Sequence, residues 1–404
     1  MTALPKLDAK SINYVLETIE TVTDSTEERR AGEKGEEQVN HLFLNELMKY
    51  CDDTNEQHFP THPGAGTVTQ KILCLLLIIC ALLFSVSVAN GYVGTAIISI
   101  LLNLGIFAVF SHKFIFDGTK LDIVKPKKSS ANVLGRRFPQ GSAQQRVVFV
   151  THSDSPLSVR SFLFGNMATQ IVAVCALIGN TLLFCSQALF LFCGAPISQP
   201  LFMVLRALCL VFVPFYIIGL VLVNPKKTAS GISSSILPSS IVLSVLKQFS
   251  EDSFRYEKTE FCCLITGSEY SGRAGSYAFA KKYRRLFSDI PTIFIPVEEI
   301  TTSDKLSVFF KDGSGNKGSA QAASIIAQAA ENLELSLTKE NTLLGTAAFT
   351  PFAVNHFPAC SIGSSKRHIS KSVSPTADKI TAIRRKTIAD IGALIIETLN
   401  YYDS

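Results

Sequence analysis

Four long apolar runs constrain the fold of this 404-residue chain more than any other feature. Each is about 18 residues or longer, and a helix of that length roughly matches the apolar thickness of a bilayer. A single run of this length is also compatible with a buried core helix, but four runs grouped in two pairs favour membrane spans. We therefore predict four transmembrane helices, at Ile72–Ala89, Val93–Phe110, Met167–Cys193 and Leu201–Val223.

The residues that flank these runs predict how the helices are arranged. Residues 90–92 join the first pair and residues 194–200 join the second, and neither joint carries a charge. The opposite ends are basic, with Lys71 before the first run and Lys226 and Lys227 after the fourth. Because cytoplasmic flanks carry an excess of Lys and Arg, we predict an integral membrane protein with two hairpins and both termini cytoplasmic.

The fourth run contains two residues that are unusual in a membrane span. Arg206 lies near the start of the run, so we expect its long side chain to reach the membrane interface. Pro214 lies further along and has no backbone N–H to donate, so we expect a kink there.

The composition excludes several other classes of protein. Charged residues make up 18% of the chain, below the roughly 25% that is usual for soluble domains. The net charge of +5 is too small to indicate a nucleic-acid partner. The 10 cysteines include no Cys-x-x-Cys pair, which argues against a zinc ribbon or a redox pair. The N-terminal stretch has no apolar segment, so we expect no cleaved signal peptide.

The polar remainder predicts one cytoplasmic domain built from three segments. These are residues 1–70, 113–165 and 224–404, with the two hairpins inserted at 71–112 and 166–223. Helical patterns alternate with short β-branched runs, which predicts an α/β sandwich with a mostly parallel sheet. The runs predicted as strands are Arg146–Thr151, Glu260–Thr266 and Thr292–Pro296.

Polar residues with catalytic chemistry follow each predicted strand. His152 and Asp154 follow the first strand, Glu269 the second and Glu298 the third. Because the carboxyl ends of parallel strands meet at one edge of a sheet, we expect these side chains to converge there. In a His-x-Asp sequence the imidazole can bind a metal while the carboxylate orients it. The pattern is typical of a metal hydrolase, although each fragment alone is also common in solvated loops.

The order of these fragments resembles the co-catalytic zinc aminopeptidase family of clan MH, the aminopeptidase Y type. That resemblance covers most of the polar chain and implies a three-layer α/β sandwich with a mostly parallel sheet and two zinc ions. It rests on the Arg- and Gly-containing stretch 27–59, Asn132–Gly135, His152–Pro156, Lys227–Gly231, Glu269–Ser276 and Lys371–Ile380.

Several ligand positions depart from the family pattern. The resemblance places Lys227 where the family has the Asp that bridges both zinc ions, and Tyr270 where it has a Glu ligand. Lys371 matches the terminal His ligand, with His368 as a displaced substitute. Lys227 would either neutralise part of the carboxylate charge at the site or simply flank the fourth span.

The positions that the resemblance retains form an incomplete metal site. His152 and, less closely, Glu298 match zinc ligands, Asp154 matches the residue that orients the histidine, and Glu269 matches the general base. Catalytic zinc normally has three protein ligands and an open position, so two ligands beside a lysine should bind zinc weakly or not at all. Without a metal-activated water, Glu269 would be a vestigial base.

Three functions are compatible with this sequence. The first is a catalytically degenerate homologue that acts in binding or scaffolding, with the lipid bilayer and a peptide or protein as partners and no nucleic acid. The second is an active membrane-bound metallo-aminopeptidase with altered ligation, using His356 or His368. The third is a transporter or channel component with a regulatory peptidase-like domain. The spans lack the paired charges of a transport path, which argues against the third function.

Overall fold

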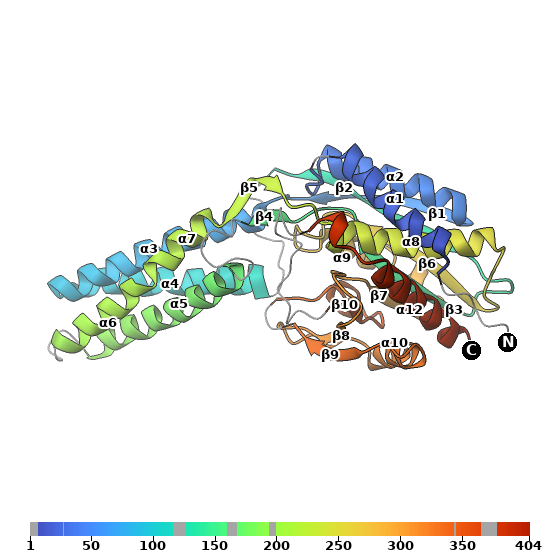
Figure 1. Cartoon of the computed structure of the whole chain (residues 1–404). Coiled ribbons are helices and arrows are strands. Elements are labelled where there is room, and N and C mark those ends of the chain that lie inside the picture. The colour runs from blue at the N-terminus through green and yellow to red at the C-terminus, as the bar shows by residue number, and fades with distance from the viewer. Residues whose placement is uncertain are drawn as a thin grey trace. The chain divides into compact units, whose positions relative to one another are not determined.

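The structure, a computed structural model, describes residues 7–26, 28–115, 126–159, 168–193, 199–342, 345–364 and 378–404. These residues form two compact units (Figure 1). Unit 1 comprises the described parts of Met1–Pro63, Lys125–Leu157 and Lys226–Ser404. Unit 2 comprises the described parts of Gly64–Val124 and Ser158–Pro225.

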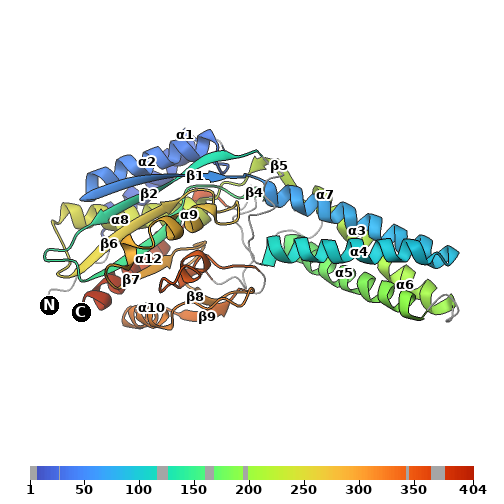
Figure 2. The ribbon, with the colours of Figure 1, turned by 180° about the vertical axis from the view of Figure 1, so that it is seen from behind.

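The centre of unit 1 is a five-stranded sheet with the order β1-β2-β6-β3-β7 (Figures 1 and 2). β3 (Gln145–His152) pairs in parallel with β6 (Thr259–Thr266) on one side and with β7 (Thr292–Pro296) on the other. β2 (Lys128–Arg137) runs antiparallel to β6, and β1 (Asp53–Thr61) runs antiparallel to β2. The sheet is therefore mixed.

The prediction of a mostly parallel sheet is correct for the β6-β3-β7 centre and wrong for the β1-β2 side. β1 lies outside the runs predicted as strands and continues through His58 and Pro60 to Thr61. β1 is an edge strand whose outward positions are polar, and Pro60 occupies an exposed position at that edge. Edge strands tolerate proline and polar residues, so their composition resembles that of a loop.

A second sheet has the order β10-β8-β9. β8 (Leu306–Lys311) pairs antiparallel with β10 (Ser361–Ser364) and parallel with β9 (Leu337–Asn341). Two isolated parallel bridges, Phe294 with Ala359 and Val297 with Ile362, connect the β7 side of the first sheet to the chain that leads into β10. The two sheets of unit 1 are thus joined where the β7 region meets β10 and the residues before it.

Helices cover both faces of the first sheet, which gives the predicted α/β sandwich. Alternate residues of β3 show the division, because Val147 and Phe149 belong to one apolar cluster and Val148 and Val150 to the other. The first cluster is covered by α1 (Ala9–Ser25), α2 (Lys34–Tyr50), α8 (Leu237–Glu251), α10 (Ala320–Asn332) and α12 (Arg385–Asp403). The second is covered by α9 (Ala274–Lys282) and α11 (Thr350–Ala353).

Unit 2 is a bundle of apolar helices. Its elements are α3 (Ala65–Asn90), α4 (Val93–Phe110), the short π-helix Ser111–Ile115, α5 (Ala168–Cys193), α6 (Gln199–Val211) and α7 (Val213–Val221). The chain breaks between α6 and α7 at Phe212, with Pro214 in the first turn of α7, which confirms the predicted kink. Two short strands, β4 (Leu157–Val159) and β5 (Val223–Thr228), pair where the chain passes between the units.

Five stretches of the described chain are helical, long and apolar enough to cross a membrane, one more than the sequence predicts. Four of them are in unit 2: α3, α4 with its extension to Lys113, α5 from Ile171, and Pro200–Val221. The fifth, Ile232–Glu251, lies in unit 1, and 94% of its most apolar window is buried there. Burial by the sheet and by neighbouring helices explains its apolar composition without a membrane.

Candidate functional site

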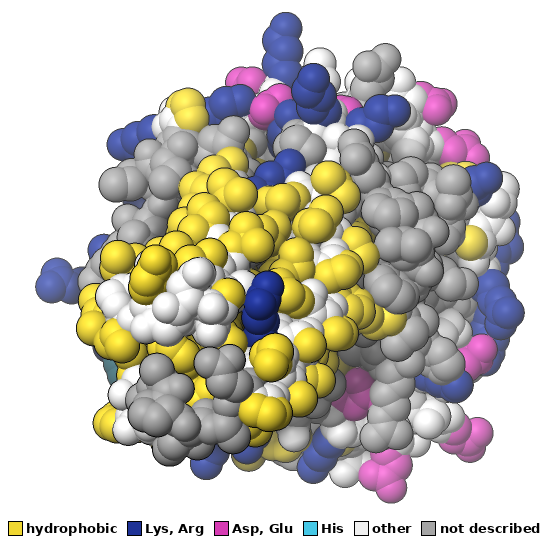
Figure 3. All heavy atoms as spheres, turned by 90° about the vertical axis from the view of Figure 1, so that its left-hand side faces the viewer, with side chains coloured by type: hydrophobic (Ala, Val, Ile, Leu, Met, Phe, Trp, Pro, Cys, Tyr) yellow, Lys and Arg dark blue, Asp and Glu magenta, His cyan; other side chains and the backbone are white. Residues whose placement is uncertain are grey.

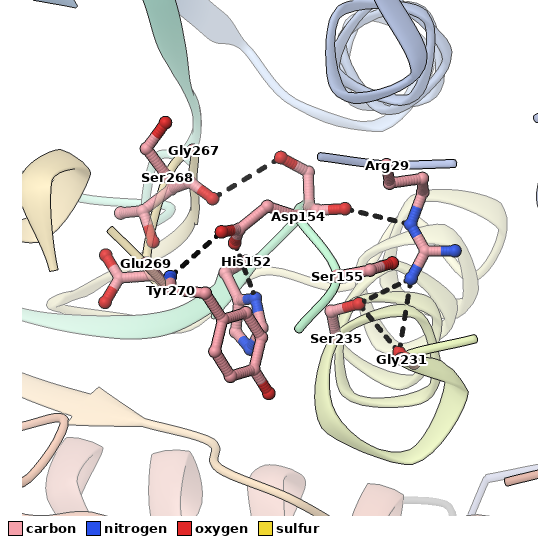
Figure 4. Close-up of polar contacts among 12 residues, drawn as sticks. Arg29, His152, Asp154, Ser155, Gly231, Ser235, Gly267, Ser268, Glu269 and Tyr270 are labelled. Atoms are coloured by element: carbon pink, nitrogen blue, oxygen red, sulfur yellow. Dashed lines mark hydrogen bonds and ion pairs between the residues drawn. The ribbon is translucent and has the colours of Figure 1, made fainter. Parts of the chain in front are cut away.

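The carboxyl edge of the first sheet brings His152, Asp154 and Tyr270 together (Figure 4). His152 ends β3 opposite Thr266, the last residue of β6, so the segments that follow the two parallel strands leave the sheet side by side. A hydrogen bond of 3.0 Å joins His152 Nδ1 to Asp154 Oδ1. The backbone N–H of Tyr270 donates to Asp154 Oδ2 over 2.9 Å. The rings of Tyr270 and His152 meet edge to face at 5.3 Å.

A buried arginine provides the positive charge beside Asp154. Arg29 is 3% exposed, and burial lowers the pKa of its guanidinium to about 10, against the opposing effect of Asp154. Its Nε donates to the Ser153 carbonyl over 3.0 Å, and its Nη2 donates to the Ser230 carbonyl and to Ser235 Oγ. Arg29 therefore stays a cation at neutral pH and holds the His-x-Asp segment against the start of the α8 region.

The carboxylate that matches the general base turns toward a helix. Glu269 Oε1 accepts from the backbone N–H of Ser276 at 3.0 Å and from its hydroxyl at 2.5 Å. Ser276 lies in the first turn of α9, where backbone N–H groups lack partners within the helix. Glu269 therefore caps α9, and its other oxygen lies 3.8 Å from Arg273 Nη1.

Glu298 also lies at this edge of the sheet but has partners of its own. Its Oε1 accepts from the hydroxyl of Ser361 at 2.6 Å and from the backbone N–H of Ala348 at 3.3 Å. These contacts tie the segment after β7 to the start of β10 and to the loop before α11.

Of the positions where this chain lacks the family's zinc ligands, one contacts the site, one is exposed and one lies outside the described residues. Lys227 lies on β5 with an exposed side chain and forms no ion pair with the described carboxylates of the site. Tyr270 takes part in the site through its backbone and its ring. Lys371 and His368 lie outside the described residues. His356 is exposed, just beyond α11.

Two buried acidic residues at this edge were not predicted from the sequence as site residues. Glu36 of α2 accepts from the backbone N–H groups of Gly32 and Ser268 at 2.6 and 2.5 Å, and from the Ser130 hydroxyl at 2.8 Å. Burial and the nearby Asp154 raise the pKa of Glu36 to about 8. The only available signal is the position of Glu36 beside the glycines of the Arg- and Gly-containing stretch.

Asp378 is the second of these residues. Its carboxylate accepts from the backbone N–H groups of Ile232 and Ser233 at 2.7 and 3.0 Å, and from the Ser230 hydroxyl at 2.8 Å. It therefore caps the helical segment that begins at Ile232 from a distance of 146 residues along the chain. Such a long-range cap leaves no local sequence pattern, although Asp378 lies within the last motif of the resemblance.

Solved structures with a similar fold include aminopeptidases and glutaminyl cyclases. A zinc aminopeptidase from Bacillus subtilis matches with a TM-score of 0.56 and 12% identity, over 98% of this chain and 95% of that chain. A leucine aminopeptidase precursor from Bacteroides thetaiotaomicron matches with a TM-score of 0.55 and 9% identity, over 98% of each chain. A glutaminyl cyclase from an Acidobacteriales bacterium also gives 0.55 and 9%, over 99% of this chain and 97% of that chain.

Identities this low show the fold alone, and they confirm the fold that the sequence motifs imply. No sequence-family model matches this chain, and no curated protein matches it.

The described residues do not fit a zinc ion as a resident cofactor. Within them, no three His, Cys, Asp or Glu side chains form a group that could hold a metal ion. Both oxygens of Asp154 already accept hydrogen bonds, and the Oε1 atoms of Glu269 and Glu298 do so as well. The best-placed metal donor is His152, whose Nδ1 is held by Asp154 and whose Nε2 remains as the other ring nitrogen.

Proposed function

We propose that this protein is an integral membrane protein whose aminopeptidase-like unit 1 binds a peptide or protein ligand without hydrolysing it. Unit 2 anchors it through four spans, with unit 1 and both termini in the cytoplasm. The fold supports the peptidase-like part of this proposal, since the similar structures include aminopeptidases. The proposed ligand, a peptide or protein, follows from this similarity to aminopeptidases.

The proposal that unit 1 does not hydrolyse its ligand depends on one observation, which is that the carboxylates of the site are already hydrogen-bonded to the protein. Asp154, Glu269 and Glu298 each accept hydrogen bonds from the protein, so each already has a structural task. A carboxylate that caps a helix or secures a loop gives up that stabilisation when it turns to a metal or a substrate. The departures at Lys227 and Tyr270 support the same conclusion, since neither side chain replaces a carboxylate toward Zn²⁺.

The membrane part of the proposal is supported by the inverted polarity of α4. Asn103 is 1% exposed and Ser99 is fully buried, whereas Leu101 is 62% exposed. A helix in water would place these residues the other way round, so the outer face of α4 suits lipid. Figure 3 shows one face of the molecule where hydrophobic side chains gather. Exposed apolar residues from unit 2 include Ile79, Leu82, Ile98, Leu101, Phe107, Ile178, Val204, Leu208 and Val211.

Metal content and peptide hydrolysis test the non-catalytic proposal. We expect the purified full chain to hold less than about one zinc per chain and to show no chelator-sensitive aminopeptidase activity. Lys227→Asp, Tyr270→Glu and Lys371→His introduced together should raise zinc binding, and single changes should do little. The matched control is the same triple variant with Lys226→Asp in place of Lys227→Asp, because it changes the same charge at a neighbouring position that matches no ligand. Zinc near two per chain in the unmodified protein, with hydrolysis lost in Glu269→Gln, would contradict the proposal.

An active metallo-aminopeptidase with altered ligation is the second candidate. One observation favours it: Asp154 holds His152 through Nδ1, as a carboxylate does when it orients a metal-binding histidine. In that case His152→Ala should remove both bound metal and hydrolysis, while His41→Ala, on the exposed face of α2, should remove neither.

A further inference from the structure

A seam of buried polar side chains runs through unit 2 between α4 and α5. Gln187 Nε2 donates to Ser99 Oγ over 2.5 Å, and Cys80 of α3 lies beside this pair, with its Sγ 3.7 Å from Gln187 Nε2. Asn103 follows Ser99 by one turn on the buried face of α4. Asn180 precedes Gln187 by two turns on α5, which places both on one face of that helix.

Three atoms of this seam have no hydrogen-bond partner within the described protein: Asn103 Nδ2, Asn180 Oδ1 and Gln187 Oε1. Gln187 is fully buried, and Asn103 and Asn180 are 1% and 7% exposed. A buried amide atom without a hydrogen-bond partner loses the bonds that it would make to water, so three in one seam indicate a ligand that supplies the missing bonds. One of the three is a donor and two are acceptors, so a suitable ligand both accepts and donates hydrogen bonds.

Contacts between the helices of unit 2 show where these three atoms lie along the axis of the bundle. Cys80 of α3 meets Gln187 and Phe84 meets Phe190, so α3 and α5 run in the same direction. Since α3 and α4 form a hairpin, α4 runs opposite to α5. Counting from the Gln187–Ser99 level at 1.5 Å per residue, Asn103 lies about 6 Å and Asn180 about 10 Å further along the axis. The gaps are therefore about 4–6 Å, and one water with two hydrogen bonds of about 2.8 Å spans about 5.5 Å.

We propose that this seam binds a short file of water molecules inside the membrane-embedded bundle. Water both donates and accepts hydrogen bonds, so it matches the mixed set of unpaired atoms, and buried water in proteins typically bonds to polar groups that would otherwise have no partner. The site rests on the proposed membrane placement of unit 2 and extends it. The seam is a hydrated interior in a unit whose outer surface is apolar.

Hydroxyl-radical footprinting of the full chain in lipid nanodiscs tests this proposal, because X-ray radiolysis of bound water oxidises the side chains beside it. Cys80 is the reporter, and Cys74 is the matched control. Both are buried thiols of α3, but Cys74 packs near Gly219, away from the seam. We expect Cys80 to be oxidised at least fivefold faster than Cys74, and we expect Asn103→Leu with Asn180→Leu to abolish that difference.

Equal oxidation of Cys80 and Cys74 in the unmodified protein would overturn the proposal and leave the amides as dry contacts between helices. This comparison needs no variant, so it decides the matter even where the double substitution fails to fold. Failure of the membrane placement is recognised separately, because the chain would then be released from cell membranes by alkaline carbonate. In that case bulk water reaches the apolar face, and the exposed Cys185 becomes the fastest-oxidised of the three thiols.

Discussion

Glu36 is a buried acidic side chain whose charged form is disfavoured in the folded domain. The carboxyl is 1% exposed and lies near Asp154, and both factors favour the protonated form. The N–H groups of Gly32 and Ser268 favour the charged form, but burial has the larger effect. Glu36 therefore makes the stability of unit 1 depend on pH.

The sign of this dependence follows from the raised pKa. Glu36 keeps its proton in the folded state up to about pH 8, whereas the unfolded chain loses it near 4.5. Its favourable contribution is complete below pH 4.5 and is lost as the pH rises to about 8, at up to about 1.4 kcal/mol per pH unit.

We expect Glu36→Gln to remove this pH dependence. Melting temperatures of the purified full chain between pH 4.5 and 8 should fall less steeply with rising pH in Glu36→Gln than in the unmodified protein. Glu20→Gln, an exposed change on α1, is the control and should leave the slope unchanged. Parallel profiles for all three proteins would show that Glu36 is charged when folded.

At the scale of elements, the start of the α8 region depends on residues from distant segments. Gly231 precedes the helical segment with a φ of +59°, a conformation that glycine adopts without strain. The absence of a Cβ there also leaves room for Arg29, since an added Cβ would lie 2.9 Å from Arg29 Nη2 and 3.1 Å from Ser155 Oγ. The carboxylate of Asp378 then completes the N-terminus.

Two glycine substitutions separate backbone strain from crowding. Gly315→Ala is the control, because Gly315 also has a positive φ of +87° but an added Cβ there meets open space. We expect Gly315→Ala to cost about 1–2 kcal/mol of unfolding free energy. Gly231→Ala should cost at least about 1 kcal/mol more, because the added Cβ also displaces Arg29 from its carbonyl partners. Equal losses in denaturant unfolding of the two variants would show that Arg29 moves away freely.

For the whole molecule, the alternation of apolar and basic segments predicts which parts share a side of the membrane. From the predicted spans and their basic flanks, we expect Asn90 to lie on the opposite side of the membrane from the segment between the hairpins. Ser142 is exposed in that segment and belongs to unit 1, so it reports the other side.

Thiol labelling tests this topology. In a chain without native cysteines, expressed in intact cells, Asn90→Cys should react with an impermeant maleimide, and Ser142→Cys should react only after the membrane is permeabilised. The reverse pattern would invert the topology, and labelling of both positions in intact cells would contradict the two-hairpin arrangement.

The sequence alone determined the features that depend on neighbouring residues. Apolar runs determined the helices of unit 2, and β-branched runs determined β3, β6 and β7, because side-chain periodicity and burial act over a few residues. Tertiary structure decided the antiparallel β1-β2 side, since an edge strand with polar outward positions has no distinctive local pattern. The site divides in the same way. His152 and Asp154 could be paired from their spacing, whereas the charge of Arg29 beside Asp154 and the cap supplied by Asp378 join segments more than 100 residues apart. Packing of the whole domain brings such partners together, so only the folded chain reveals them.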